Sequence, residues 1–208
     1  MQIRRLFLIA FLTAPIFLSA NIINKSPADP RSYEVFKLDN GLEVITISDE
    51  SLATSAATLS VGVGAYQDPS SAQGIAHFLE HMIFMGSDKY KDPNEYMQFI
   101  SENGGETNAF TADQQTTYLF SINNDKFEDA LDRLSAAIKS PLFDGTMVEK
   151  EINAVNSEWL LRRQSEAFIR QRTAAMTGNP NHPKTLLGVG NKETLSSEKE
   201  TLLQIYKS

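Results

Sequence analysis

The stretch Gly74–Tyr90, GIAHFLEHMIFMGSDKY, combines a run of apolar residues with two histidines and a glutamate. It predicts a helix from about Ala72 to Met85, closed by Gly86, because glycine commonly ends helices in the left-handed conformation. At about 100° per residue, His77 and His81 then lie one turn apart on the same helix face. Two imidazoles placed in this way can reach one metal ion.

Glu80 completes the pattern H-x-x-E-H, the inverted form of the zinc peptidase helix. Neutral imidazoles bind zinc and leave a position open for water, whose pKa zinc lowers toward about 7. A nearby carboxylate can take the proton of that water and deliver it to the leaving amine. Two structural histidines are the alternative, but burying them with a glutamate in an apolar helix would cost free energy unless a partner compensated. The sequence therefore predicts a metal site at this helix.

A catalytic zinc needs a third protein ligand, and the sequence offers several. His182 is one candidate, and the segment VEKEINAVNSEWLL adds Glu149, Glu151 and Glu158. Glu151 and Glu158 are seven residues apart and fall on one helix face. Periodicity alone leaves the choice open, since a charged helix face also explains these carboxylates.

Strands and helices alternate in mixed order around this segment. β-rich runs predict strands at residues 33–38, 42–47, 56–63, 108–111 and 116–122, the first two joined by a tight turn at 39–41. Capping residues and apolar periodicity predict helices that begin at Asp92 and Asn124, and others at about Thr146–Met176 and Ser197–Tyr206. This order predicts an α+β fold, a layer sandwich in which a mixed, mainly antiparallel sheet packs against helices.

The composition limits the chemistry of the site. The chain has 208 residues, no cysteine, three histidines and a net charge of −7. Without cysteine there is no disulfide framework, no thiol nucleophile and no thiolate zinc site. The acidic balance argues against a nucleic-acid partner, which usually selects a basic surface.

Residues 1–20 have the layout of a secretory signal peptide. Arg4 and Arg5 precede an apolar run over Leu6–Leu18, and small residues follow at a plausible cleavage point. An uncleaved membrane anchor is the alternative, although the run is short of the roughly 20 apolar residues of a spanning helix. We expect an exported protein, periplasmic or secreted if the source is bacterial, with no membrane contact after cleavage. Residues 21–31 then form a linker, and residues 32–208 the zinc-bearing domain.

Four motifs resemble the insulysin/pitrilysin family of zinc metallopeptidases. They are GIAHFLEHMIFMGSDKY, NGGETNAFTADQQTTYLFSI (Asn103–Ile122), EKEINAVNSEW (Glu149–Trp159) and NPNHP…GVGN (Asn179–Asn191). The motifs occur in order, with the family's spacing, and the similarity covers about residues 31–207. The resemblance implies a zinc-dependent metalloendopeptidase that binds one Zn²⁺ per chain and hydrolyses small unfolded peptides.

The resemblance also implies a role for each matching residue. His77 and His81 would bind zinc, and Glu80 would be the general base. The family's third ligand is the second glutamate of an E-x6-E pair, some 75 to 80 positions after the second histidine, which selects Glu158. Glu151, the first glutamate of that pair, would support a zinc ligand from outside the coordination sphere.

Three further residues match parts of the family pattern. Asn108 and Ala109 match the strand that pairs with the substrate backbone beside the zinc, as in β-strand addition. His182 matches a loop motif, so its implied role is structural. Family members are long chains or paired subunits, and this sequence would end inside the first domain. A second half or subunit would then complete the substrate clamp, and the alternative function is a truncated or partner-dependent subunit that binds zinc without catalysing alone.

Overall fold

The computed structural model describes residues 24–195, and the chain divides into two compact units between Leu52 and Ala53. In the first unit, β1 (Ser32–Lys37) pairs with β2 (Glu43–Ser48) in an antiparallel hairpin. Gly41 takes a φ of 90° in the connecting turn, a left-handed conformation that glycine adopts without a steric cost. This hairpin confirms the strands predicted at 33–38 and 42–47.

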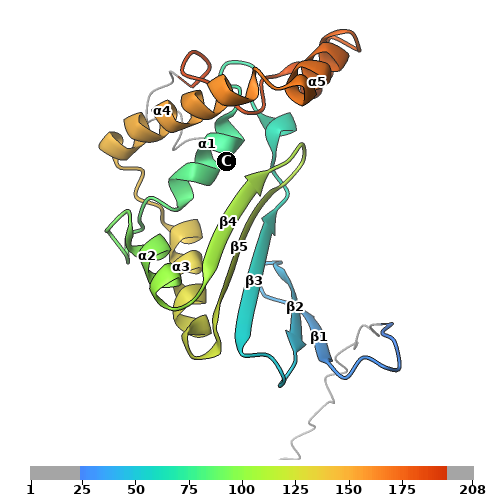
Figure 1. The fold of residues 1–208 in the computed structure, drawn as a ribbon, viewed down its shortest axis with the longest axis vertical. Coiled ribbons are helices and arrows are strands. Elements are labelled where there is room, and N and C mark those ends of the chain that lie inside the picture. Colours follow the sequence, from blue (N-terminus) through green and yellow to red (C-terminus); the bar gives the residue numbers. More distant parts are fainter. Residues whose placement is uncertain (1–23, 196–208) are drawn as a thin grey trace, which may run out of the picture. The chain divides into compact units, whose positions relative to one another are not determined.

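The second unit contains a three-stranded sheet. Its strands are β3 (Thr54–Val61), β4 (Glu106–Thr111) and β5 (Thr116–Asn123), in the order β3-β5-β4. Both pairings are antiparallel. Because β4 is last in this order, it is an edge strand of the sheet (Figure 1). The helices of this unit pack against and beside the sheet, which confirms the predicted α+β class.

Two helices share a core with the sheet, α2 (Glu95–Glu102) and α3 (Phe127–Lys139). A short 3-10 turn, η2 (Asn124–Lys126), leads into α3. The core takes apolar side chains from both helices, from β5 and from the end of α1, including Ile100, Phe120, Ile122, Ala130 and Leu134. Each of these five is at most 2% exposed, so this core anchors β5 and, through the ladder, the edge strand β4.

A second core joins α1 (Ile75–Ile83) to α4 (Gly145–Arg162), which cross near one end of β4 (Figure 1). Asp144 begins α4, because its carboxylate accepts the backbone N–H groups of Thr146 and Met147. Three further elements complete the described fold: η1 (Ala65–Gln67), α5 (Glu166–Met176) and η3 (Pro183–Thr185).

The helix predicted over Thr146–Met176 is wrong as a single element. It breaks after Arg162, and α5 begins at Glu166. Ser165 causes the break locally, because its hydroxyl accepts the backbone N–H of Phe168 at 3.2 Å and caps a new helix. Neither glycine nor proline marks the interruption, so the usual helix-ending signals were missing.

Three predicted helix starts also differ from the structure. The helix predicted to begin at Asn124 starts at Phe127, because residues 124–126 form the 3-10 turn η2. The helix predicted from Ala72 begins at Ile75, after Gly74 in a left-handed conformation with φ 87°. The helix predicted to begin at Asp92 starts at Glu95, because Asp92 instead closes a turn by accepting the N–H of Asn94 at 2.9 Å.

Several predictions concern residues outside the described range. The signal peptide at residues 1–20 and the helix at Ser197–Tyr206 lie outside it, and the linker at 21–31 is described only from residue 24. Across residues 24–195, no helix is both long and apolar enough to cross a membrane.

A candidate metal centre between two helices

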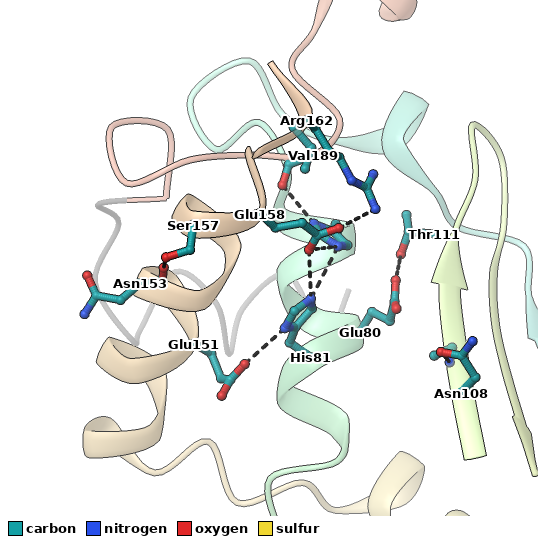
Figure 2. Close-up of polar contacts among 12 residues, drawn as sticks. Glu80, His81, Asn108, Thr111, Glu151, Asn153, Ser157, Glu158, Arg162 and Val189 are labelled. Atoms are coloured by element: carbon teal, nitrogen blue, oxygen red, sulfur yellow. Dashed lines mark hydrogen bonds and ion pairs between the residues drawn. The ribbon is translucent and has the colours of Figure 1, made fainter. Parts of the chain in front are cut away.

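The orientation of α1 follows from its apolar side. Phe78 and Met82, one turn apart, are both 0% exposed and pack in the core shared with α4. His77 precedes Phe78 and His81 precedes Met82, so the two histidines lie on the adjoining face of α1. Figure 2 shows that His81 is directed toward α4, and Nε2 of both histidines lies within 3.7 Å of Glu158 on that helix.

Asp68 fixes the start of this helix. Its carboxylate accepts the backbone N–H of Gly74 at 2.7 Å and that of Ala76 at 3.0 Å. These are two of the N–H groups that a helix leaves without an intrahelical partner. Burial raises the pKa of Asp68 to about 6, although both hydrogen bonds act in the opposite direction.

Hydrogen bonds at Nδ1 define which nitrogen each histidine offers to a metal. His77 Nδ1 lies 2.8 Å from the carbonyl oxygen of Val189, and His81 Nδ1 lies 3.0 Å from Glu151 Oε2 (Figure 2). A carbonyl or carboxylate oxygen only accepts, so both Nδ1 atoms carry a proton. Both Nε2 atoms are therefore directed inward, and they lie 3.3 Å apart.

Glu158 on α4 brings the third ligand atom. Its Oε2 lies 3.4 Å from Nε2 of His77 and 3.7 Å from Nε2 of His81. One ligand atom from each of the three residues lies within 4.8 Å of the other two. Three acceptor atoms at such separations repel one another unless a cation or a proton lies between them. The donor set of two imidazoles and one carboxylate suits zinc.

Without a metal, a proton on His81 supplies the positive charge between these three atoms. Burial acts to lower the pKa of His81, but its bonds to Glu151 and Glu158 outweigh burial and raise the pKa to about 9. His77 and His81 in turn hold the pKa of Glu158 well below its usual range. A metal that binds here must displace the proton of His81.

Glu80 lies beside this cluster and points toward β4 (Figure 2). It is 8% exposed, and its Oε2 accepts the hydroxyl of Thr111 at 2.6 Å. This bond restrains the carboxylate and leaves Oε1 as the oxygen that can take a proton.

The edge of β4 next to Glu80 has backbone groups that are directed away from β5. In the hairpin that joins β4 to β5, the N–H of Ala112 donates to the carbonyl of Gln115 at 2.8 Å. Backbone direction alternates along a strand, so Ala109 and Thr111 direct their N–H and C=O groups away from β5. The N–H of Ala109 donates to the side chain of Asn108 at 2.9 Å.

A cleft of about 830 Å³ opens onto these groups. Its lining includes the two histidines, Glu80 and Glu158, the β4 residues 108–111, one side of α5, and residues 183–184 and 186–189. The three candidate ligand residues, the Glu80 carboxylate and the edge of β4 thus line one cavity.

The other candidate third ligands lie elsewhere. The side chain of His182 caps η3 by accepting the N–H of Lys184 at 3.1 Å, and its ring contacts Tyr66 edge-on at 5.3 Å. Glu149 is exposed on α4. Glu151 touches His81 through Nδ1 and so supports the ring from outside the ligand cluster.

Three groups at the site were missed by the sequence reasoning. Arg162 forms an ion pair with Glu158 and reaches toward the cleft (Figure 2), a contact that the four-residue spacing could have suggested. Thr111 and the carbonyl of Val189 had no such signal. Their partners lie 31 and 112 residues away in the chain.

This α+β unit brings two histidines and a glutamate around one point, where they could hold a metal ion, with a further carboxylate beside them. The chain belongs to the insulinase family, peptidase family M16, whose family model matches residues 43–182.

Named relatives agree with this assignment. The chain is 42% identical to insulin-degrading enzyme of Homo sapiens over 177 residues, and 40% identical to Protease 3 of Escherichia coli (strain K12) over 176 residues. Each alignment covers 85% of this chain, but only 17% and 18% of those proteins. The crystal structure of pitrilysin superposes with a TM-score of 0.86 and 38% identity, over 90% of this chain and 20% of that one. This chain therefore spans less than a quarter of the length of these relatives.

Proposed function

We propose that this chain is the zinc-bearing part of an exported metalloendopeptidase that hydrolyses small unfolded peptides. The observation that carries the proposal is the convergence of His77 Nε2, His81 Nε2 and a Glu158 oxygen within 4.8 Å of one another. Each imidazole has its other nitrogen engaged, so the three atoms form a set prepared for one Zn²⁺.

These residues fit zinc in chemistry as well as in position. They would hold the ion by two neutral nitrogens and one carboxylate, which leaves a position open. Zinc bound there would polarise the scissile carbonyl and lower the pKa of its water toward about 7.

Glu80 has the position of the general base. Its Oε1 takes the proton of the attacking water and later delivers it to the leaving amine, while Thr111 holds Oε2. The carboxylate thus stays beside the reacting bond through both transfers. Because Thr111 also belongs to the edge strand, the base and the proposed substrate strand share one support.

The edge of β4 has the position of the substrate site. An extended peptide can pair with the outward N–H and C=O groups of Ala109 and Thr111. The Asn108 side chain, which accepts the Ala109 N–H here, must yield that donor to the peptide. Recognition through backbone groups favours unfolded peptides over any particular sequence.

A binding and cleavage experiment tests the proposal. The full 208-residue chain is titrated with Zn²⁺ against a chromophoric chelator, and cleavage of a quenched fluorescent peptide is then followed with and without chelator. We expect one zinc per chain and chelator-sensitive cleavage. Glu80→Gln should retain zinc and lose cleavage by about 10²- to 10⁴-fold. Absence of zinc binding would refute the site, and full activity of Glu80→Gln would refute the role of the base.

A second candidate is a subunit that binds zinc but needs another polypeptide for catalysis. The coverage of only 17–20% of the relatives favours it. Stoichiometric zinc without cleavage would select this candidate over the first. Export is tested separately by cell fractionation and by mass spectrometry of the mature N-terminus, where cleavage near residue 20 is expected.

A further inference from the structure

A tight turn directs a backbone carbonyl at His77. The turn spans Leu187–Gly190, and the N–H of Gly190 closes it by donating to the Leu187 carbonyl at 2.8 Å. The third residue of this turn, Val189, is 8% exposed, and its carbonyl accepts from His77 Nδ1. This turn comes 112 residues after the histidine that it contacts.

Two glycines let the turn reach the start of α1. A Cβ on Gly74 would lie 2.2 Å from the Cα of Gly190, far inside any permitted contact. A Cβ on Gly190 would lie 3.1 Å from the Cα of Gly74 and 3.0 Å from Leu195 Cδ1. Gly190 also has a φ of 71°, which disfavours other residues. A Cβ at Gly74 would therefore overlap the backbone of Gly190, and a Cβ at Gly190 would crowd both Gly74 and Leu195.

Polar contacts hold the turn against the same helix end. The N–H of Leu187 donates to Gln73 Oε1 at 2.7 Å. Upstream of the turn, Arg172 on α5 donates to the carbonyl of Leu186 at 2.6 Å. Downstream, Leu195 is 1% exposed in the core shared by α1 and α4. The turn is thus fixed on both sides, and Val189 has little freedom to move away from the imidazole.

We propose that the Leu187–Gly190 turn is a positioning element of the metal site, with Gly190 and Gln73 as the residues that hold it in place. The proposal rests on the proposed function, because it presumes that His77 binds zinc. Without the Val189 carbonyl, the His77 ring is free to rotate and to place its proton on either nitrogen. Loss of such a supporting hydrogen bond lowers metal affinity by about 10- to 100-fold.

Gly190→Ala tests the glycine contact in the full chain, with Gly145→Ala as its matched control. A Cβ at Gly145 meets no atom within 4 Å, and its φ is not in the left-handed region. Zinc affinity is measured by chelator competition, and imidazole N–H protons are observed by ¹H–¹⁵N NMR of the zinc-loaded chain. We expect Gly190→Ala to bind zinc about 10- to 100-fold more weakly and to lose the Nδ1–H resonance of His77. Gly145→Ala should keep the wild-type affinity and both resonances, of His77 and His81.

Gln73 provides a second test that does not strain the backbone. Gln73→Leu removes the acceptor for Leu187 and should weaken zinc binding, whereas Gln73→Glu keeps an acceptor and should restore it. If Gly190→Ala does not fold, this pair decides the question alone. A turn that only packs would lower the unfolding midpoint of the metal-free chain without changing zinc affinity or the His77 resonance, which would overturn the proposal. A wild-type chain that binds no zinc would overturn it together with the proposed function, whereas zinc binding unaffected by Gln73→Leu overturns the proposal alone.

Discussion

Glu151→Gln should change how zinc affinity depends on pH. In the metal-free chain, the bonds to Glu151 and Glu158 overcome the effect of burial and hold the pKa of His81 at about 9, above its ordinary value of 6.5. Zinc and this proton compete for Nε2 of His81. The apparent zinc affinity of the wild-type chain should therefore rise about tenfold per pH unit from pH 7 to about 9, a total of about 100-fold, and then level off.

The glutamine variant keeps an oxygen that can accept the His81 Nδ1–H but lacks the negative charge. Its His81 pKa should fall, so that proton competition ends at a lower pH. At pH 9 the variant should bind zinc about tenfold more weakly, because the imidazole loses a charged partner. Toward pH 7 the two affinities should converge. His81 of the wild-type chain is still mostly protonated there and must release its proton to bind zinc, whereas His81 of the variant has largely lost that proton.

The assay is zinc competition against a chelator whose own protonation is known, at half-unit steps from pH 6.5 to 9.5. Parallel pH curves for the two proteins would refute the reasoning. Unfolding by urea in excess chelator gives an independent check of sign. The raised pKa of His81 stabilises the metal-free fold fully below pH 6.5, and this stabilisation should disappear as the pH rises through about 9.

Substitutions at three other residues test contacts that do not involve the His81 proton. Phe78→Ala should lower the free energy of unfolding by about 3–5 kcal/mol in urea, because the side chain is 0% exposed and leaves a cavity. Arg172→Ala should lower it by about 1.5–3 kcal/mol, since the guanidinium donates to the carbonyls of residues 184–186, and Arg172→Lys should recover part of the loss. Arg162→Ala frees the second oxygen of Glu158, so the visible spectrum of the Co²⁺-loaded chain should shift toward higher coordination, and an unchanged spectrum would contradict that role.

Local patterns predicted most of the helices and strands. The Asp39-Asn40-Gly41 turn predicted the β1–β2 hairpin, and the apolar stripe from Phe127 predicted α3, because both signals act within a few residues. The long helix over Thr146–Met176 was wrong because a single serine cap ended it, without the glycine or proline on which such predictions depend.

The choice of the third candidate ligand could not be made from local sequence patterns. Spacing placed Glu151 and Glu158 on one face of a helix and could not choose between them, so the choice came from the family resemblance. In the structure, Glu158 approaches Nε2 of both histidines while Glu151 approaches Nδ1 of His81 alone. The difference of two helical turns is set by how α4 crosses α1, a matter of packing.

The sequence by itself determined the motif His77–His81 with its glutamate, the absence of any thiolate ligand and the α+β order of elements. These follow from residue identity and short-range periodicity, which act before the chain folds. Only the tertiary structure decided which nitrogen of each imidazole is available, because that depends on the Val189 carbonyl and the Glu151 carboxylate. Such contacts join residues 70 and 112 positions apart, and packing between distant segments has no counterpart in the local sequence.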